Sequence, residues 1–485
     1  MAEKSLKINA IFSFIKAFMN LAFPIITFPY ASRILLPDGI GKVNFINSVV
    51  QYFIMFAELG IASYSIREAS KIRKDDIAFT KFSKEIFTIN IISTIFAYCL
   101  LFISIFISQL LFEYRILIIL CSVKILFTTL GMDWMYAAKE EFKYITIRTI
   151  FFQLISLIYL FLFVKDSSDI IEYTIFGILS STGSNICNFI YSRKFINWKY
   201  KVKLEFKKHL KPIFILFGTT LAISVYTILD STMLGFLVGN ESVGIYTAAT
   251  KINKMLITLI ASLNIILLPR LSFYAESNKD DYIKTLKKSY NYIIMISLPL
   301  FVGLCVLSKP LTYVFCGKSF ENAIIPMQLM SPIILIISLG SFFSQQIFIP
   351  NRKDKYAFYP VVVGSIVNVV INFLLIPKYK AIGAAIATLF AEATVTTIKF
   401  FLGKKILINT NFFYEKIYHY ILATLIMGIS LFFINQTLSP TIISLIVELF
   451  IGIIIYFTIL IIFRNNYIIE LFNDINKKLR KKDGH

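Results

Sequence analysis

The residues of this 485-residue chain that could bind a ligand are charged side chains inside long apolar stretches. Five lysines have this setting: Lys16, Lys124, Lys251, Lys254 and Lys399. In a membrane, a charge at bilayer depth costs at least about 3 kcal/mol unless it faces a cavity or a partner. Lysine ammonium groups bind phosphate and carboxylate. An anion is therefore the expected ligand.

Other polar residues share helical faces with these lysines. Residues three and four positions apart lie on one face of a helix. Within residues 10 to 31, this spacing joins Ser13, Lys16, Asn20, Pro24 and Thr27. Within residues 43 to 66, it joins Asn44, Ser48, Gln51 and Glu58. We expect two polar stripes that avoid lipid.

The same pattern returns 203 residues later, where Gly41 matches Gly244 and Arg67 matches Arg270. The offset carries the two stripes onto Thr219, Thr227, Asp230, Thr247, Lys251 and Lys254. A parallel repeat predicts two pseudo-symmetric lobes around a central cavity. The expected cavity lining consists of Asn20, Ser48, Gln51, Thr219, Thr227 and Thr247. Lys16, Arg33, Arg67, Lys251, Lys254 and Arg270 are the expected cationic ligands of the substrate, and Glu58 and Asp230 are candidates for carrying a coupling ion.

The composition identifies the elements that must position these residues. Hydrophobic residues make up 57%, charged residues 16%, and mean hydropathy is +0.74, which excludes an ordinary soluble protein. Continuous apolar runs of about 20 residues predict an all-α polytopic membrane protein with about fourteen transmembrane helices. The predicted spans are 10–31, 43–66, 86–110, 116–137, 149–164, 173–192, 213–238, 244–268, 289–308, 323–349, 359–377, 381–402, 418–434 and 442–463.

The positions of the basic residues predict the orientation. The N-terminus, every second loop and the C-terminal tail carry 36 of the 49 Lys and Arg, and the opposite loops carry eight. The positive-inside rule then places both termini in the cytoplasm. The net charge of +21 reflects this bias and interaction with membrane lipids, so nucleic acid is not an expected partner.

The repeat and the loops predict four regions. Residues 1–192 form an N-terminal six-helix lobe, 193–212 a basic, solvated cytoplasmic linker, and 213–402 a C-terminal six-helix lobe. Residues 403–485 add two helices and a basic tail.

The sequence offers no constellation for catalysis, a metal or a cofactor. The five cysteines are scattered, and the three histidines, His209, His419 and His485, are far apart. The segment Cys316 to Ser319 resembles the end of a phosphate-binding loop, but Thr312 replaces its first glycine.

Four short patterns resemble Wzx-type O-antigen and capsule repeat-unit flippases, of the multidrug/oligosaccharidyl-lipid/polysaccharide exporter superfamily. The first is the run of Pro24, Thr27, Pro29, Tyr30, Arg33 and Leu35. The others are the Gly39-x-Gly41 turn, the segment with Leu59, Gly60 and Arg67, and Trp134 followed by EEFKYITIR from Glu140 to Arg148. The resemblance extends over essentially the whole chain.

This resemblance implies a bacterial plasma-membrane carrier without a cofactor. Its substrate would be an undecaprenyl-pyrophosphate-linked oligosaccharide, moved outward by alternating access for O-antigen, capsule or related surface polysaccharide synthesis. Polysaccharide polymerase and chain-length proteins would be its partners. Related lipid II flippases have a cationic residue in span 8, and the segment Tyr246 to Lys251 puts Lys251 there. Those flippases also have arginine-rich first spans, whereas this chain has Lys16.

Two alternatives remain open at this stage. A cation-coupled multidrug or small-molecule exporter of the same superfamily would use a carboxylate in span 1 or 7, and Asp230 is compatible with that. A membrane enzyme of polysaccharide assembly would need a long outward loop or clustered carboxylates, which the sequence lacks.

Overall fold

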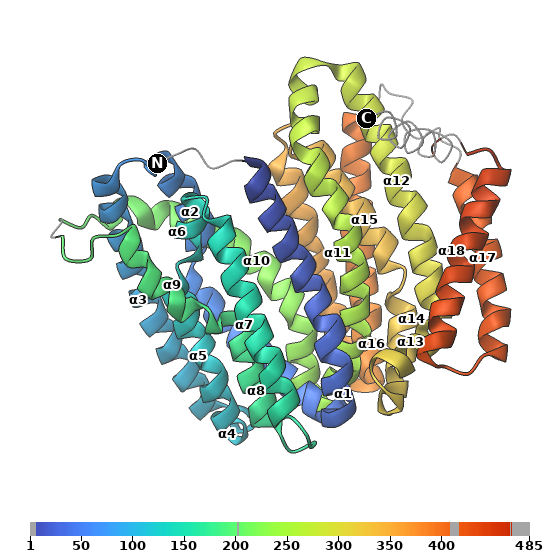
Figure 1. Cartoon of the computed structure of the whole chain (residues 1–485), viewed down its shortest axis with the longest axis horizontal. Helices are drawn as coiled ribbons and strands as arrows, with labels where there is room; N and C mark the ends of the chain where they lie inside the picture. The colour runs from blue at the N-terminus through green and yellow to red at the C-terminus, as the bar shows by residue number, and fades with distance from the viewer. Residues whose placement is uncertain (1–5, 201–202, 408–416, 466, 468–485) are drawn as a thin grey trace, which may run out of the picture. The chain divides into compact units, whose positions relative to one another are not determined.

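A computed structural model describes residues 6–200, 203–407, 417–465 and 467, and within these it is helical without any strand (Figure 1). Side chains at positions 6, 7, 10, 219, 220, 222–226 and 262–266 are outside the described set. Eight of the described helical segments are long and apolar enough to cross a membrane, or nine if one bent pair counts as a single span. The protein is therefore an all-α, multi-pass membrane protein, as the composition predicts.

The chain divides into two compact units, Met1–Gly244 and Ile245–His485. The helices of the first unit are α1 (Leu6–Glu58), α2 (Ile61–Lys71), α3 (Asp76–Ile107), α4 (Gln109–Glu113), α5 (Arg115–Gly131), α6 (Asp133–Ala138), α7 (Phe142–Phe163), α8 (Ile170–Ile178), the π-helix η1 (Leu179–Gly183), α9 (Asn185–Tyr191), the short η2 (Ser192–Lys194) and α10 (Lys207–Leu237).

Helix α11 (Asn240–Ser277) crosses the boundary into the second unit. The further helices there are α12 (Lys279–Val306), α13 (Ser308–Phe315), η3 (Lys318–Ala323), α14 (Ile324–Met330), α15 (Ile333–Phe342), the π-helix η4 (Phe343–Phe348), α16 (Asp354–Ile406), α17 (Ile417–Thr437) and α18 (Ile442–Ile462). Each of the fourteen predicted spans coincides with one of these helices, part of one, or consecutive helices.

Two helices are longer than one crossing and are broken inside. α1 and α16 each have 53 residues, and non-helical backbone interrupts them at Leu36 and Lys380. These breaks separate predicted spans 1 and 2 and spans 11 and 12. Leu36 has φ 59°, a left-handed value that is costly for a side chain with a β-carbon.

The 203-residue repeat is visible in the local backbone of its two copies. Leu36 matches Gly239, and both have positive φ. Asp75 matches Asn278, and each caps the next helix by accepting bonds from two backbone N–H groups. Further along, Glu140 and Arg352, which are 212 residues apart, are both left-handed. Each N–H donates to the carbonyl three residues before it, and the N–H of the next residue donates to the carbonyl five residues before that one. The sequence repeat is therefore a structural repeat.

The start of the second repeat packs on the first through two glycines in a reciprocal contact. A β-carbon on Gly41 would lie 1.7 Å from the carbonyl oxygen of Asn240, and one on Gly244 would lie 1.9 Å from that of Pro37. Asn240 is itself the repeat counterpart of Pro37. Such close approach requires residues without a β-carbon.

This contact explains where the first unit ends. The ring of Phe45 fills the space over Gly235, and Asn240 donates to the hydroxyl of Tyr114 at 2.8 Å. α10 also packs on α1 and α2. The compact unit consequently extends to Gly244, beyond the predicted linker at 193–212, while the predicted four-region division remains a prediction.

The linker region is less solvated than expected. Phe195 and Ile196 are buried, and His209 joins buried Glu85 at 2.8 Å and the Tyr64 hydroxyl at 2.7 Å. The basic residues of this segment led to the prediction of a solvated linker. The apolar residues between them, however, pack against α2, α3 and α6.

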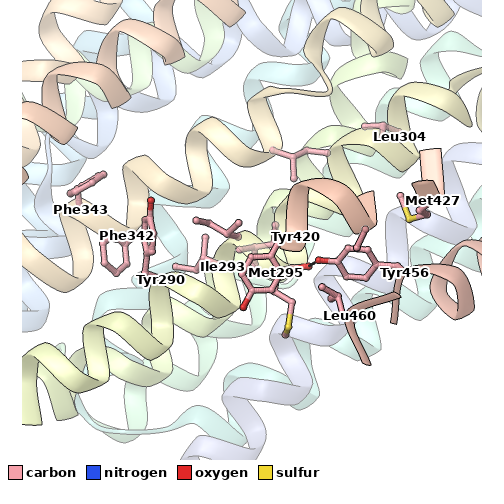
Figure 2. Packing of buried hydrophobic residues seen from close by; sticks show 14 of the residues in the cluster. Tyr290, Ile293, Met295, Leu304, Phe342, Phe343, Tyr420, Met427, Tyr456 and Leu460 are labelled. Atoms are coloured by element: carbon pink, nitrogen blue, oxygen red, sulfur yellow. Dashed lines mark hydrogen bonds between the residues drawn. The ribbon is translucent and has the colours of Figure 1, made fainter. Parts of the chain in front are cut away.

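The core of the second unit lies among α12, α15, α17 and α18 (Figure 2). Tyr420 on α17 and Tyr456 on α18 lie within it, and Tyr456 donates to the carbonyl of Met295 at 2.8 Å. The buried hydroxyl of Tyr456 is thus satisfied by a neighbouring helix, as a membrane interior requires.

The glycine contact gives a stability prediction. Gly41→Ala should lower the unfolding free energy by about 1 to 3 kcal/mol, because its methyl group must push back the Asn240 carbonyl. Thermal unfolding in detergent measures this. Gly303→Ala on α12 is the matched control, since nothing lies within 4 Å of its β-carbon position, and alanine there should be neutral or stabilising. Equal melting temperatures for the two variants would refute the close contact.

Candidate functional site

Lys16 on α1 lies at a polar seam between α1 and α7. Thr146 on α7 donates to the carbonyl of Phe12 at 3.0 Å, and Gln153 donates to the Asn20 side chain at 3.1 Å. These two contacts bracket Lys16, which is half-buried. Asp133 attracts the ammonium group and Arg148 repels it. Lys16 therefore lies within electrostatic range of both Asp133 and Arg148.

Arg148 and Asp133 form an ion pair beside Lys16. Arg148 is 8% exposed, and its Nη2 lies 3.2 Å from Oδ1 of Asp133. The same oxygen accepts from Nδ2 of Asn188 at 2.8 Å. The left-handed backbone at Met132 ends α5 and makes Asp133 the first residue of α6, where the N-terminal end of the helix dipole favours a negative charge.

A small cavity of about 70 Å³ lies next to this pair. Glu58 and Asp133 both line it, together with amide and hydroxyl groups of Asn90, Thr128 and Asn185. Two carboxylates that face the same cavity repel one another unless a proton or cation lies between them. Glu58, a predicted coupling residue, is therefore placed beside a second carboxylate.

Lys124 is a half-buried lysine that does not belong to the predicted substrate site. Its Nζ donates to Oδ1 of Asn47 on α1 at 2.6 Å, and the thiol of Cys121 also points to this oxygen at 3.5 Å. Asn47 lies beside Ser48 on α1. A polar residue next to the predicted stripe in the second half of α1 thus binds a lysine from α5.

The other predicted residues of the first unit have mixed settings. Ser48 is buried and accepts from Thr232 on α10 at 3.0 Å. Asp230 is also buried, with Tyr52 in its electrostatic field. The exposed members are Asn20, Arg33, Gln51, Arg67 and Thr227, and the side chain of Thr219 is outside the described set. Arg67 binds Glu68 at 2.9 Å.

In the second unit, α11 carries the remaining cations. Lys251 is half-buried and Lys254 is exposed, and their ammonium groups repel one another. Thr247, one turn before Lys251, is half-buried. Arg270 near the end of α11 is exposed and bonds to the hydroxyl of Tyr274 at 3.0 Å. The structure thus brings Lys251 and Lys254 together and keeps Arg270 separate on Tyr274.

A protein family described as "Polysaccharide biosynthesis protein" matches residues 6–275, which is more than half of the chain. The chain belongs to this family. The matched range includes α1 and nearly all of α11, so it contains every predicted site residue. The resemblance first based on the Pro24 to Leu35 run and the Glu140 to Arg148 segment is confirmed.

Two individual proteins are similar to this chain over most of their length. The "Putative O-antigen transporter" of Escherichia coli K12 is 28% identical over 407 residues, 81% of this chain and 95% of that protein. The "Capsular polysaccharide biosynthesis protein CapF" of Staphylococcus aureus is 24% identical over 405 residues, 80% and 93% of the two chains.

Two solved structures share the fold of this family member. "Lipid II flippase MurJ, inward closed conformation" has a TM-score of 0.75 at 20% identity, covering 95% of this chain and 99% of its own. A "multidrug resistance MATE family transporter of the MOP superfamily" has a TM-score of 0.61 at 12% identity, covering 82% and 96%. These likenesses confirm the two-lobe fold predicted from the repeat.

Sequence reasoning missed Arg148 and Lys124 as members of the polar site. In the sequence, Arg148 stood out only as the last residue of the segment from Glu140 to Arg148. Its pairing with Asp133 joins α6 to α7, and spacing along one helix contains no signal for such a contact. For Lys124, its setting inside an apolar span was the available signal.

The Asp133 and Arg148 pair gives a second prediction. Asp133→Asn should lower the free energy of unfolding by about 1 to 3 kcal/mol, because it leaves the buried guanidinium of Arg148 without its counter-charge. This cost is below that of breaking a fully buried ion pair, because Asp133 is more than half exposed. The double variant Asp133→Asn with Arg148→Met should recover part of the loss. A double variant less stable than the sum of the single losses would contradict the pairing.

Proposed function

We propose that this chain moves a lipid-linked oligosaccharide across the plasma membrane of a bacterium by alternating access. The substrate would be carried on undecaprenyl pyrophosphate for O-antigen, capsule or related surface polysaccharide. Family membership and the transporter and capsule names of its relatives support the pathway. The shared fold with a lipid II flippase supports the carrier class.

The observation that carries this proposal is the pair of lysines on α11. Lys251 and Lys254 lie within electrostatic reach of one another on a helix that the family match includes. A pyrophosphate between them would replace the repulsion of two ammonium groups with attraction to an anion. Thr247, one turn away, adds a hydroxyl donor for a phosphate oxygen.

Energy would come from a coupling ion or from the substrate gradient. Glu58 and Asp230 are our candidates for an ion-binding role, and Glu58 has the better-defined setting because its cavity also contains Asp133. A cation-coupled exporter is the second candidate function. The buried carboxylate of Asp230 and the fold shared with a multidrug transporter favour it.

Both termini would lie in the cytoplasm, on the side of the basic loops. The chain would act without catalysis and without a cofactor, next to polymerase and chain-length proteins that consume the flipped repeat unit.

The lysine pair can be tested in a strain that depends on this gene for its surface glycan. Lys251→Ala with Lys254→Ala should abolish surface glycan while the protein stays in the membrane, since the pyrophosphate loses both cations. Glycan staining and membrane immunoblots measure the two outcomes.

The matched control is Lys404→Ala with Lys405→Ala, which removes two exposed charges at the end of α16. Lys251→Arg with Lys254→Arg should retain transport because the positive charge remains. Normal glycan in the alanine double variant would overturn the lysine site. Loss of drug resistance in place of glycan would favour the exporter.

Orientation gives a separate prediction. In a variant without native cysteines, Asp75→Cys should react with an impermeant thiol reagent only after the membrane is opened. Ser167→Cys, in the short turn between α7 and α8, should react in intact cells. The reverse pattern would refute the cytoplasmic placement of the termini.

A further inference from the structure

A basic hollow of about 770 Å³ lies on the first unit where the segment after α9 crosses the start of α3. Arg193, Lys194 and Lys199 line it, with Trp198 and Tyr200 beside them. Asp76 is the acidic residue of the lining, and it lies 3.5 Å from Lys139. The hollow therefore has a clear excess of positive charge.

The segment that forms the hollow is held in a defined conformation. The indole N–H of Trp198 donates to Ser192 at 3.1 Å, and its ring packs edge-on to Phe87 at 5.2 Å. Nζ of Lys84 donates to the carbonyls of Trp198 and Tyr200. These bonds fix the backbone on both sides of Lys199, so the lining of the hollow has a defined conformation.

Lys194 has a defined position at one edge. Its Nζ donates to the Tyr191 hydroxyl at 3.0 Å, and this bond raises the pKa of Lys194 above its usual range. The ammonium group also lies over the Tyr191 ring, 5.2 Å from its centre. Lys194 is consequently charged at every physiological pH.

A second, apolar hollow adjoins the basic one and shares Lys194 with it. It measures about 400 Å³ and is lined by Tyr144, Cys187, Ile190 and Tyr191. The rings of Tyr144 and Tyr191 are stacked at 4.2 Å, and Ile190 is 59% exposed. In a membrane protein, exposed isoleucines on a helix next to tyrosine, tryptophan and lysine mark the boundary between acyl chains and headgroups.

We propose that these adjoining hollows bind one anionic phospholipid of the phosphatidylglycerol type. The headgroup phosphate lies among Arg193, Lys194 and Lys199, and an acyl chain follows Ile190 and Cys187 along α9. Basic side chains attract anionic lipid at the membrane surface, and arginine and lysine bind phosphate oxygens. The combination of a basic hollow with an adjoining apolar one matches a phospholipid better than a soluble anion. The site is independent of the proposed transport function.

The test uses the full-length protein in neutral detergent and brominated phosphatidylglycerol, which quenches nearby tryptophan. The chain has two tryptophans, and Trp134 is buried while Trp198 lines the hollow. Quenching of Trp198 should saturate as brominated phosphatidylglycerol is added. Brominated phosphatidylcholine should require a much higher concentration, because its headgroup has no net charge.

Arg193→Gln, Lys194→Gln and Lys199→Gln together should weaken this binding about 100-fold, at about fivefold for each charge. Lys211→Gln, Lys404→Gln and Lys405→Gln form the control, with the same change in net charge at exposed positions elsewhere. Equal weakening by the control variant, or equal quenching by the two lipids, would overturn the site.

Two further arms separate the sources of phosphate. Ile190→Asn should weaken binding of the brominated lipid. The fold weakening caused by the triple glutamine variant should be the same with and without Ile190→Asn. Inorganic phosphate or pyrophosphate should not displace the lipid at equal concentration. Displacement by either ion, with no effect of Ile190→Asn, would show a phosphate site in place of a phospholipid site.

Discussion

The structure depends on one constraint: the interior of a bilayer offers no hydrogen-bonding solvent, so each polar group there needs a protein partner. In the first unit, Lys124 meets Asn47 and Gln153 meets Asn20, and each bond joins another helix to α1. The Asp133 and Arg148 pair does the same for α6 and α7. Polar residues that could bind a ligand thus also hold the helices together.

The two repeats meet this constraint with different residues at equivalent positions. Ser48 needs only a hydroxyl partner, Thr232, and it is buried within the first unit. Its counterpart Lys251 carries a positive charge, and Lys254 lies in its electrostatic field. The backbone of the repeat is shared, while its polar chemistry has diverged.

The sequence predicted the helices and the repeat well because both depend on local signals. Apolar runs bounded by charge give the spans. Matched positions share local features in both copies, namely a positive φ at Leu36 and Gly239 and a helix cap at Asp75 and Asn278. The site was predicted less completely. Arg148 and Lys124 gain their meaning from partners on other helices, and helical spacing describes only one helix at a time. The burial of Phe195 within a basic segment was hidden for the same reason.

Helix α11 belongs to both compact units. Its first residues, up to Gly244, pack on α1 in the first unit, and the remainder belongs to the second unit. Transmembrane helices are not driven together by the hydrophobic effect, so their association depends on van der Waals contact, which close approach at glycine supplies. The start of α11 is therefore tied to α1, and Lys251 lies about two turns beyond that attachment.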